Sequence, residues 1–251
     1  MEKETGVLQS VVRAFRVLEA VGRLGHPASL SEIATEAGVD KSAAQRMVNT
    51  LLSLGYLERN SGRSGYVPGR HILVHAYDYL KNTRIIERAT PVLIELRRNA
   101  RERIDLSIME GSMIIYAVRL QSKRQNFPAT LIGRRLPAFA SSGGRAMMSL
   151  MKRHEVEAIL DASDLHQITP KTICDREALL AEVEKAARIG YALAVEEVLP
   201  GEVVLAAPVR DAEGRPVAAL HIAGSLSEWE VETFCAQFGP LATEAAELLS
   251  R

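Results

Sequence analysis

The chain has 251 residues, of which 25% are charged and 47% hydrophobic, and its 31 basic and 31 acidic side chains leave no formal net charge. This composition is typical of a globular protein with one large or two ordinary domains. No apolar run approaches the roughly 20 residues that cross a bilayer, and residues 1–10 lack an export signal, so we expect a cytoplasmic protein without a membrane partner. The distant Cys174 and Cys235 favour reduced thiols over a disulfide framework.

The absence of net charge argues against a nucleic-acid binder that relies on bulk charge. The distribution is slightly uneven, because residues 1–70 contain 9 Lys and Arg against 7 Asp and Glu, which gives +2 there and −2 in the remainder. Any DNA binding must therefore depend on the local placement of basic groups and on dimerisation.

The N-terminal part of the chain predicts three helices. Apolar residues recur at helical spacing over residues 8–24, and residues 28–57 predict two short helices joined by a tight turn. Ser29 and Glu32 have the spacing of a capping box at the start of the first of these two. Gly38 is expected to end that helix in a left-handed conformation, and Asp40 to cap the next.

The last of these three helices has an apolar side, with Ala44, Met47, Val48, Leu51 and Leu52, and an opposite polar side. The polar side chains are Lys41, Ser42, Gln45, Arg46 and Asn49. Such a set can hydrogen-bond to base edges and phosphates in a major groove, which indicates a helix-turn-helix with this helix as the DNA reader. An ordinary helical hairpin with a solvated face explains the pair equally well when it is taken alone.

A predicted β-hairpin follows the reader helix. Residues 56–59 and 66–67 have strand character and flank the turn-forming residues 60–65. A hairpin in this place is a wing, and Arg59 and Arg63 near its tip are candidates for phosphate contacts. Three helices followed by a wing form a much more specific pattern than a helix pair.

The remainder of the chain predicts an α+β fold with a mainly antiparallel sheet. A connecting helix is expected at 71–81, followed by a longer helix to about 101 in which Pro91 marks a kink or the start. Strands are predicted at 104–108, 113–120, 130–137, 191–198, 203–209 and 216–223, and helices at 145–151, 155–160, 175–189 and 227–249. The expected domains are a DNA-binding domain (1–69), a linker helix (70–82) and an effector-binding and oligomerisation domain (83–251).

Together these residues resemble the IclR family of bacterial transcriptional regulators over nearly the whole chain. The matching runs are 9–11 (QSV), 13–14 (RA), 17–19 (VLE), 30–34 (LSEIA), 38–39 (GV), 41–42 (KS), Arg46, 55–57 (GYL), 137–146 (PAFASSGGRA), 169–173 (TPKTI), 190–191 (GY), 196–197 (EE), Gly201 and 206–209 (AAPV). The family usually has Lys in place of Arg145 and often Thr in place of Ala43. The resemblance implies a GAF-like effector domain, a homodimer or dimer of dimers, and operator binding controlled by a ligand.

The glycine-rich run that includes Ser141, Ser142 and Gly143 precedes a predicted helix. Successive backbone amides there would suit a carboxylate, although a plain strand-to-helix turn is the alternative.

His221 shares one face of its predicted strand with Ala219 and Ala223, which leaves room for a ligand beside the imidazole. A core histidine bonded to the backbone fits equally well on the residues alone. The family resemblance favours a role in the effector site, and by the same resemblance Ala194 and Val204 are its apolar walls and Leu136 closes it.

Catalytic motifs are absent from the sequence: it has no nucleophile elbow, P-loop or zinc-protease spacing. His71 and His75 could share a metal, but no third ligand follows with suitable spacing, so packing explains them better. The doublets at 134–135 and 196–197 are interpreted as mainly solvated surface.

We therefore expect a sequence-specific regulator without cofactor or metal. Its partners would be double-stranded operator DNA and a small metabolite, a carboxylate or aromatic acid, with repression favoured over activation. The alternative is a ligand-sensing interaction protein or an enzyme whose winged helix does not bind DNA.

Overall fold

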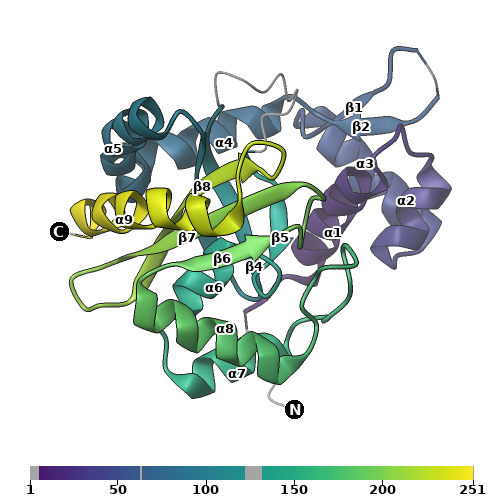
Figure 1. Ribbon diagram of the computed structural model, residues 1–251. Helices are drawn as coiled ribbons and strands as arrows, with labels where there is room; N and C mark the ends of the chain where they lie inside the picture. Colours follow the sequence, from purple (N-terminus) through teal and green to yellow (C-terminus); the bar gives the residue numbers. More distant parts are fainter. Residues whose placement is uncertain (1–5, 63, 122–131, 251) are drawn as a thin grey trace. The chain divides into compact units, whose positions relative to one another are not determined.

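The computed structural model describes residues 6–62, 64–121 and 132–250, and Figure 1 shows the order of its elements. Arg63 and residues 130–131 of a predicted strand lie outside these ranges. The internal contacts divide the chain into two compact units, Met1–Asn82 and Thr83–Arg251, which are described separately.

The first unit is a winged helix-turn-helix followed by a further helix. Its elements in chain order are α1 (Gln9–Leu24), α2 (Leu30–Ala37), α3 (Lys41–Ser53), β1 (Leu57–Arg59), β2 (Tyr66–Pro68) and α4 (His71–Asn82). β1 and β2 pair antiparallel and form the wing. The predicted three helices and wing are confirmed.

The predicted local signals of the helix pair are also confirmed. The amide of Ser29 donates to the Glu32 carboxylate (2.8 Å) and the amide of Glu32 donates to the Ser29 hydroxyl (3.3 Å), which completes the capping box. Gly38 ends α2 with φ of 64°, and the Asp40 carboxylate accepts the amide of Ala43 (2.8 Å) at the start of α3. The start of α2 and the turn between the two helices are therefore each specified by local signals.

A small apolar core joins the helices of this unit to the wing. Val17, Ile33, Val48 and Leu57 are fully or almost fully buried in it. The wing is tied back to the residues before α2, because Ala28 and Tyr66 exchange both backbone hydrogen bonds (2.9 and 2.8 Å).

The helix α4 contains no buried residue among those described in its span. Its apolar side chains include Leu73 and Tyr77, which are 71% and 61% exposed. On α1, Phe15 is likewise 58% exposed. Both helices thus present apolar surface that the described residues of their own unit do not cover.

The second unit is built on a six-stranded antiparallel sheet with the order β5-β4-β3-β8-β7-β6. The strands are β3 (Arg103–Glu110), β4 (Met113–Leu120), β5 (Arg135–Pro137), β6 (Ala192–Val195), β7 (Glu202–Arg210) and β8 (Pro216–Ser225). The helices are α5 (Arg84–Ala100), α6 (Ser142–Met148), α7 (Arg153–Asp161), α8 (Arg176–Ile189) and α9 (Val231–Leu249). The predicted α+β class and mainly antiparallel sheet are confirmed.

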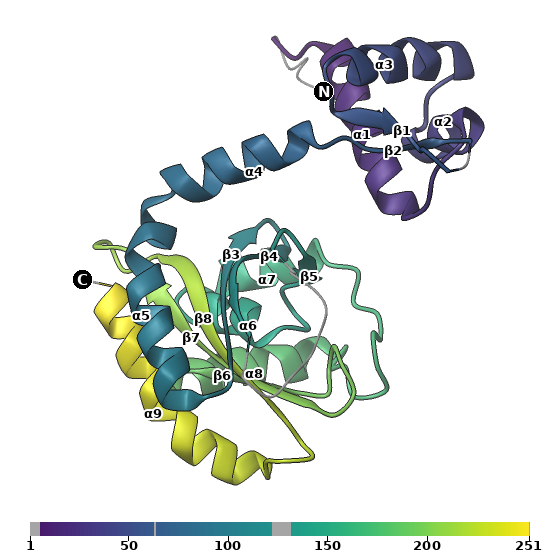
Figure 2. The ribbon, with the colours of Figure 1, turned by 90° about the horizontal axis from the view of Figure 1, so that it is seen from above.

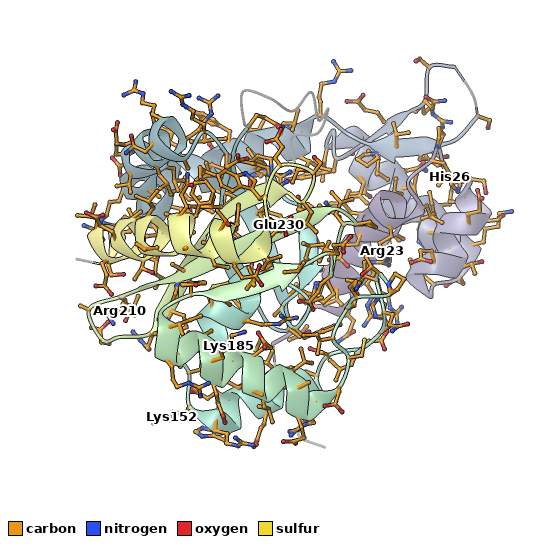
Figure 3. All side chains as sticks on the ribbon, viewed as in Figure 1. Arg23, His26, Lys152, Lys185, Arg210 and Glu230 are labelled. Atoms are coloured by element: carbon orange, nitrogen blue, oxygen red, sulfur yellow. The ribbon has the colours of Figure 1, made fainter. Side chains whose placement is uncertain are left out.

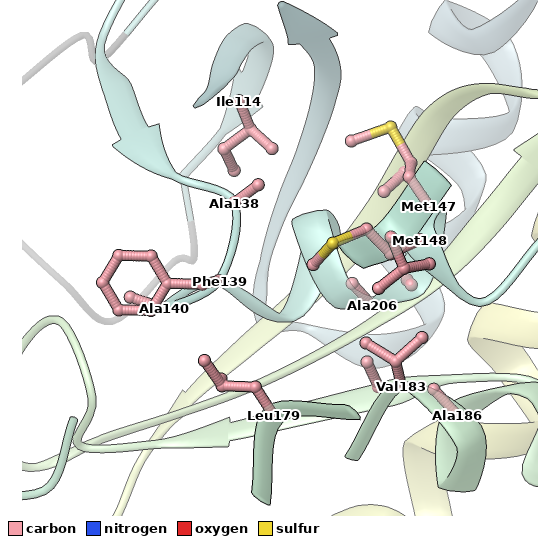
Figure 4. Packing of buried hydrophobic residues seen from close by; sticks show 14 of the residues in the cluster. Ile114, Ala138, Phe139, Ala140, Met147, Met148, Leu179, Val183, Ala186 and Ala206 are labelled. Carbon is pink, nitrogen blue, oxygen red and sulfur yellow. The ribbon is translucent and has the colours of Figure 1, made fainter. Parts of the chain in front are cut away.

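Helices cover both faces of this sheet. Figure 2 shows α5 and α9 together on one face and α6, α7 and α8 on the other. Between the sheet and α6 to α8 lies a core in which Phe139, Met147 and Met148 are almost completely buried (Figure 4). β8 is buried on both faces over most of its length, because it lies centrally in the sheet.

Several boundaries differ from those predicted. α6 begins at Ser142 rather than at residue 145, so the two serines and two glycines form the helix start instead of a loop before it. α5 runs from Arg84 through Pro91, which therefore marks neither its start nor an interruption of the assigned helix. β6 ends at Val195, because Glu196 adopts φ of 56°. Within the described ranges, no helix is both long and apolar enough to cross a membrane.

Candidate functional site

The first candidate site is the polar face of α3. Lys41, Ser42, Arg46 and Asn49 are exposed and Gln45 is half-buried, whereas Ala44 and Val48 on the opposite side are fully buried. The structure thus brings the predicted base-reading residues together on one face of one helix. Ala43, where the family often has Thr, is also buried and does not belong to this face.

Hydrogen bonds organise the polar side chains of α3 before any partner binds. The Ser42 hydroxyl donates to the Asp40 carboxylate (2.7 Å), and the Gln45 amide donates to the Asn49 carbonyl (2.9 Å). These contacts leave most donors and acceptors at the surface, where amide side chains can pair with adenine and a guanidinium with guanine.

The wing adds a positively charged group to this unit. The Arg59 guanidinium lies 5.4 Å from the centre of the Tyr66 ring, a cation–π contact that orients an exposed side chain. Arg63, the other predicted wing residue, lies outside the described ranges. The charge of Arg70 is less available to a partner than that of Arg59, because the Glu58 carboxylate accepts the Nε–H of Arg70 at 2.7 Å.

The second candidate site is a cavity of about 40 Å³ in the second unit. Five of the eight predicted effector residues line it: Leu136, Ser141, Ser142, Ala194 and Val204. The other three, Gly143, His221 and Ala223, are buried outside its described lining. Further lining residues that sequence reasoning missed are Arg103, Tyr116, Arg119, Arg134, Ala140, Glu196, Glu197, Val198, Leu199 and Glu202.

A network of buried charges forms one side of this cavity. The carboxylate of Asp105 is completely buried and accepts from Arg119 through Nε and Nη2 (2.8 and 3.1 Å) and from Arg103 through Nε (3.0 Å). Arg103 also donates to Glu202 through Nη1 (2.5 Å). The two arginines and two carboxylates balance, so the network is neutral and rigidly held.

The alternation of polar and apolar residues in β3 could have indicated this network. Arg103, Asp105 and Ser107 alternate with Ile104 and Leu106, which places the polar side chains on one face of the strand. Because both faces are covered by helices, that polar face needed buried partners, and they come from the neighbouring strand β4 (Arg119) and from the distant β7 (Glu202).

Tyr116 lies beside the charge network and is 5% exposed. The Arg119 guanidinium lies 5.2 Å from the centre of its ring. Burial, and then the nearby Asp105 carboxylate, raise the pKa of the Tyr116 phenol, so its hydroxyl remains a protonated donor.

His221 is fully buried beneath the start of α6. Its Nε2 is 2.7 Å from the Ser107 hydroxyl, and its Nδ1 is the buried side-chain atom for which the described residues offer no hydrogen-bond partner. Burial, followed by the positive charges of Arg103 and Arg119, lowers the pKa of His221 to about 3, so the imidazole is neutral at pH 7.

The glycines of α6 allow the helix to approach the sheet closely. A Cβ atom on Gly143 would lie 2.3 Å from Cε1 of His221, and one on Gly144 would lie 2.2 Å from the Ala138 carbonyl oxygen. Two of the four backbone amides proposed for a carboxylate are already engaged, because that of Gly144 donates to the Ser141 hydroxyl (3.0 Å) and that of Ser141 to Ala138 (3.3 Å). The run is therefore chiefly a close-packing element.

A second buried ion pair holds Glu197, another residue of the cavity lining. Arg145 donates to both carboxylate oxygens of Glu197, one of them at 2.8 Å, and its Nε donates to the Phe139 carbonyl (2.8 Å). The interpretation of residue 197 as solvated was therefore wrong, since Glu197 is 5% exposed. Surface pairs such as Arg210 with Glu247 are half exposed, and Figure 3 shows Arg210, Lys152 and Lys185 at the outside of this unit.

The histidine pair of α4 has a packing role. The Tyr56 hydroxyl and His75 Nε2 are 2.6 Å apart, and the His71 ring lies edge-on to both rings. In the described part of the chain, no three His, Cys, Asp or Glu side chains are grouped to hold a metal ion.

Comparison with known proteins gives two family matches and full-length relatives. Residues 10–61 match the IclR helix-turn-helix domain, and residues 77–251 match the bacterial transcriptional regulator IclR C-terminal domain. The chain is 28% identical to the transcriptional regulator XynR of Escherichia coli (98% of this chain, 97% of the relative) and 27% identical to the acetate operon repressor of Salmonella typhimurium (89% and 82%).

A solved structure adds a ligand-bound relative. The IclR homologue from Microbacterium hydrocarbonoxydans, crystallised in complex with 4-hydroxybenzoate, is 26% identical, with a TM-score of 0.77 over 96% of this chain and 97% of that one. The winged helix, the antiparallel effector domain and the matches over both units agree: the chain belongs to the IclR family of bacterial transcriptional regulators and is a DNA-binding regulator under small-molecule control.

Proposed function

We propose that α3 of this regulator enters the major groove of double-stranded operator DNA and reads its sequence. The side chains assigned to base edges are Ser42, Gln45, Arg46 and Asn49, and those assigned to phosphates are Lys41, Arg59 and Arg63. The observation that carries this assignment is the exposed polar face of α3, backed by a buried apolar face in a winged helix. Binding to the chromosome makes the cytoplasm its place of action.

The regulator acts as a homodimer or a dimer of dimers in this proposal. A charge of +2 over residues 1–70 supports only weak binding by one copy, whereas two copies read half-sites about one helical turn apart. The uncovered apolar side chains of α1 and α4, such as Phe15 and Leu73, support contacts between copies. Residues 1–69 bind DNA, 70–82 link the domains, and 83–251 bind the effector and oligomerise.

The cavity behind the Arg103 and Arg119 network is the proposed effector site. A water molecule needs about 10–15 Å³ by the same measure, so a cavity of about 40 Å³ accommodates on the order of three such groups. This size favours a short carboxylic acid over an aromatic one. Apolar walls from Leu136, Ala194 and Val204 suit its hydrocarbon part.

We favour repression over activation, as the name of the Salmonella relative suggests, and we infer that the effector relieves it. The effector must then bind the DNA-free arrangement more tightly than the DNA-bound one, because a ligand shifts an equilibrium only through its differential affinity.

Fluorescence anisotropy on DNA from upstream of the protein's own gene tests the DNA assignment. Wild-type protein should bind this DNA more tightly than random DNA, and its affinity should fall as salt rises from low to physiological concentration. Arg46→Ala should weaken specific binding by roughly 5- to 150-fold, as expected for loss of a bidentate base contact worth about 1–3 kcal/mol.

The matched control is Arg210→Ala, which removes the same charge from a half-exposed ion pair of the second unit and should leave binding unchanged. Absence of binding to any DNA, even at low salt, would overturn the proposal and favour an interaction protein.

A further inference from the structure

An acidic side chain lies at the start of α3, the proposed DNA-reading helix. Asp40 caps this helix, and its Oδ1 accepts both the amide of Ala43 (2.8 Å) and the hydroxyl of Ser42 (2.7 Å). These hydrogen bonds, with a smaller effect of the Arg46 charge, lower the pKa of Asp40, so its carboxylate is ionised at neutral pH. The other charged residues of α3 are Lys41 and Arg46, so Asp40 halves the positive charge of the helix and its cap.

The charge of Asp40 opposes the binding of a DNA phosphate at this end of α3. A helix N-terminus is a common site for a phosphate, because its free amides point outward and the macrodipole favours an anion. In α3 the Asp40 carboxylate already takes that position and accepts the amide of Ala43. The carboxylate therefore repels a phosphate from the start of α3 and occupies a donor that the phosphate would need.

Asp40 also fixes the role of the Ser42 hydroxyl. A serine hydroxyl can donate or accept, so it can pair with either kind of base edge. Because its single hydrogen is donated to Asp40, Ser42 offers only lone pairs to other groups. Nη1 of Arg46 lies 3.5 Å from this oxygen, at the outer limit of a hydrogen bond. The exposed guanidinium of Arg46 thus lies at the end of a chain that begins at the helix cap, and it has fewer orientations to lose on binding.

We infer that Asp40 is a positioning residue for operator reading: through Ser42 it holds Arg46 for a base edge, and its charge excludes a phosphate from the start of α3. Asp40 therefore lowers the affinity for random DNA and raises the ratio of operator affinity to random-DNA affinity. The inference rests on the proposed DNA assignment of α3 and adds the residue that sets its selectivity.

Fluorescence anisotropy of full-length variants separates these two effects, with DNA from upstream of the protein's own gene and random DNA as probes over a series of salt concentrations. Asp40→Asn removes the charge but keeps an oxygen that can cap α3 and accept from Ser42, since Asn and Asp cap helices about equally well. Ser42→Ala keeps the charge and the cap but breaks the link to Arg46. The matched control is Asp175→Asn, because Asp175 caps α8 of the second unit by accepting the amide of Ala178 (2.8 Å).

Asp40→Asn should bind random DNA about threefold or more tighter than wild-type protein. Its plot of log affinity for random DNA against log salt concentration should steepen by about 0.9 for each reader helix that gains a phosphate contact. The ratio of operator affinity to random-DNA affinity should fall about fivefold or more. Ser42→Ala should show the same loss of ratio with an unchanged salt slope, and Asp175→Asn should match wild-type protein.

An unaltered ratio in either Asp40→Asn or Ser42→Ala would overturn the inference. Unchanged or weaker binding of random DNA by a folded Asp40→Asn protein would also overturn it, because a role in capping alone predicts no gain of affinity. Ser42→Ala decides the link to Arg46 even if Asp40→Asn folds poorly. Failure of the proposed function is seen separately, because wild-type protein would then show no preference for the upstream DNA over random DNA.

Discussion

Buried arginines determine the geometry around the proposed effector cavity. The side chains of Arg119 and Arg145 are 4% and 1% exposed, and each is paired with a carboxylate that is equally buried. A buried ion pair adds little stability over an apolar pair of the same shape, but removing one partner leaves an uncompensated charge and is expensive. These pairs therefore constrain which substitutions the effector domain tolerates.

Removing the carboxylate of Glu197 should destabilise the second unit strongly. Glu197→Ala leaves Arg145 buried without its partner, and we expect a loss of about 3–5 kcal/mol in the free energy of unfolding. Trp229, the single tryptophan of the chain, lies in this unit, so its fluorescence in urea reports the transition. The control Glu247→Ala breaks a half-exposed pair and should cost at most about 1 kcal/mol; equal losses in the two variants would contradict the prediction.

Acid should destabilise the second unit through His221. Its pKa is about 3 in the folded protein and about 6.5 when unfolded, so between these values the unfolded chain binds a proton that the folded one does not. The contribution of His221 to the free energy of unfolding is therefore complete above pH 6.5. Below that pH the free energy of unfolding falls by about 1.4 kcal/mol per pH unit. Between pH 7 and pH 5 the free energy of unfolding should fall by about 2 kcal/mol. This interval lies above the pH range in which ordinary carboxylates titrate.

The variant His221→Gln checks this pH dependence. It does not titrate, so Trp229-detected unfolding should give a smaller difference between pH 7 and pH 5 than in wild-type protein, whatever its stability at pH 7. An unaltered difference would show that other groups cause the acid effect.

Sequence patterns predicted individual site residues unevenly. The polar residues of α3 could be placed on one face because they lie on one helix, where spacing alone determines the face. The alternation in β3 indicates the polar face to which Arg103 belongs, but not its partner Glu202, which lies 99 positions away on β7. Charge alone predicts exposure for a residue such as Glu197, and its burial depends on a partner 52 positions away.

At the scale of elements, the predictions succeeded where local signals are strong. The capping box of α2, the left-handed Gly38 and the cap of α3 at Asp40 each specify a boundary by contacts within four residues. The start of α6 was placed three residues late, because two glycines and a serine disfavour helix. Packing overrides that preference there, since only a residue without Cβ fits against His221 at position 143.

The exposed apolar residues of α4 should govern association of copies. Leu73→Asp places a charge on the uncovered side of α4, so we expect a shift towards monomer in sedimentation velocity and at least a tenfold loss of operator affinity. Ile189→Asp, the same type of change at a 44% exposed position on α8, is the control. If the Leu73→Asp protein kept its mass in sedimentation and its operator affinity, the result would show that α4 is not part of the interface between copies.

At the scale of the whole molecule, the proposed DNA-reading face of α3 and the proposed effector cavity belong to different compact units. Control of one by the other is then a coupling free energy, and the coupling is necessarily reciprocal. An effector that lowers operator affinity by a given factor must itself bind less tightly, by the same factor, when operator DNA is present.

Reciprocity can be measured with any short carboxylate that binds. We expect operator affinity to fall about 5- to 150-fold on saturation with the acid, and the affinity for the acid to fall by an equal factor on saturation with operator DNA. Random DNA is the control and should have a smaller effect. Factors that differ by more than experimental error would mean that the ligand acts through a process other than a shared equilibrium.

Because the apolar surface of α4 is exposed, the association of copies and the folding of α4 should depend on the protein concentration. An isolated helix of this length is marginal in water, and α4, which contacts Tyr56 through His71 and His75, buries none of its described side chains. If a second copy supplies that support, dilution would separate the copies. It would also unfold α4, the helix that joins the DNA-binding domain to the effector-binding domain. Protease sensitivity at residues 71–82 would then rise as the protein is diluted, and the cell's copy number would set how much of the regulator is competent to repress.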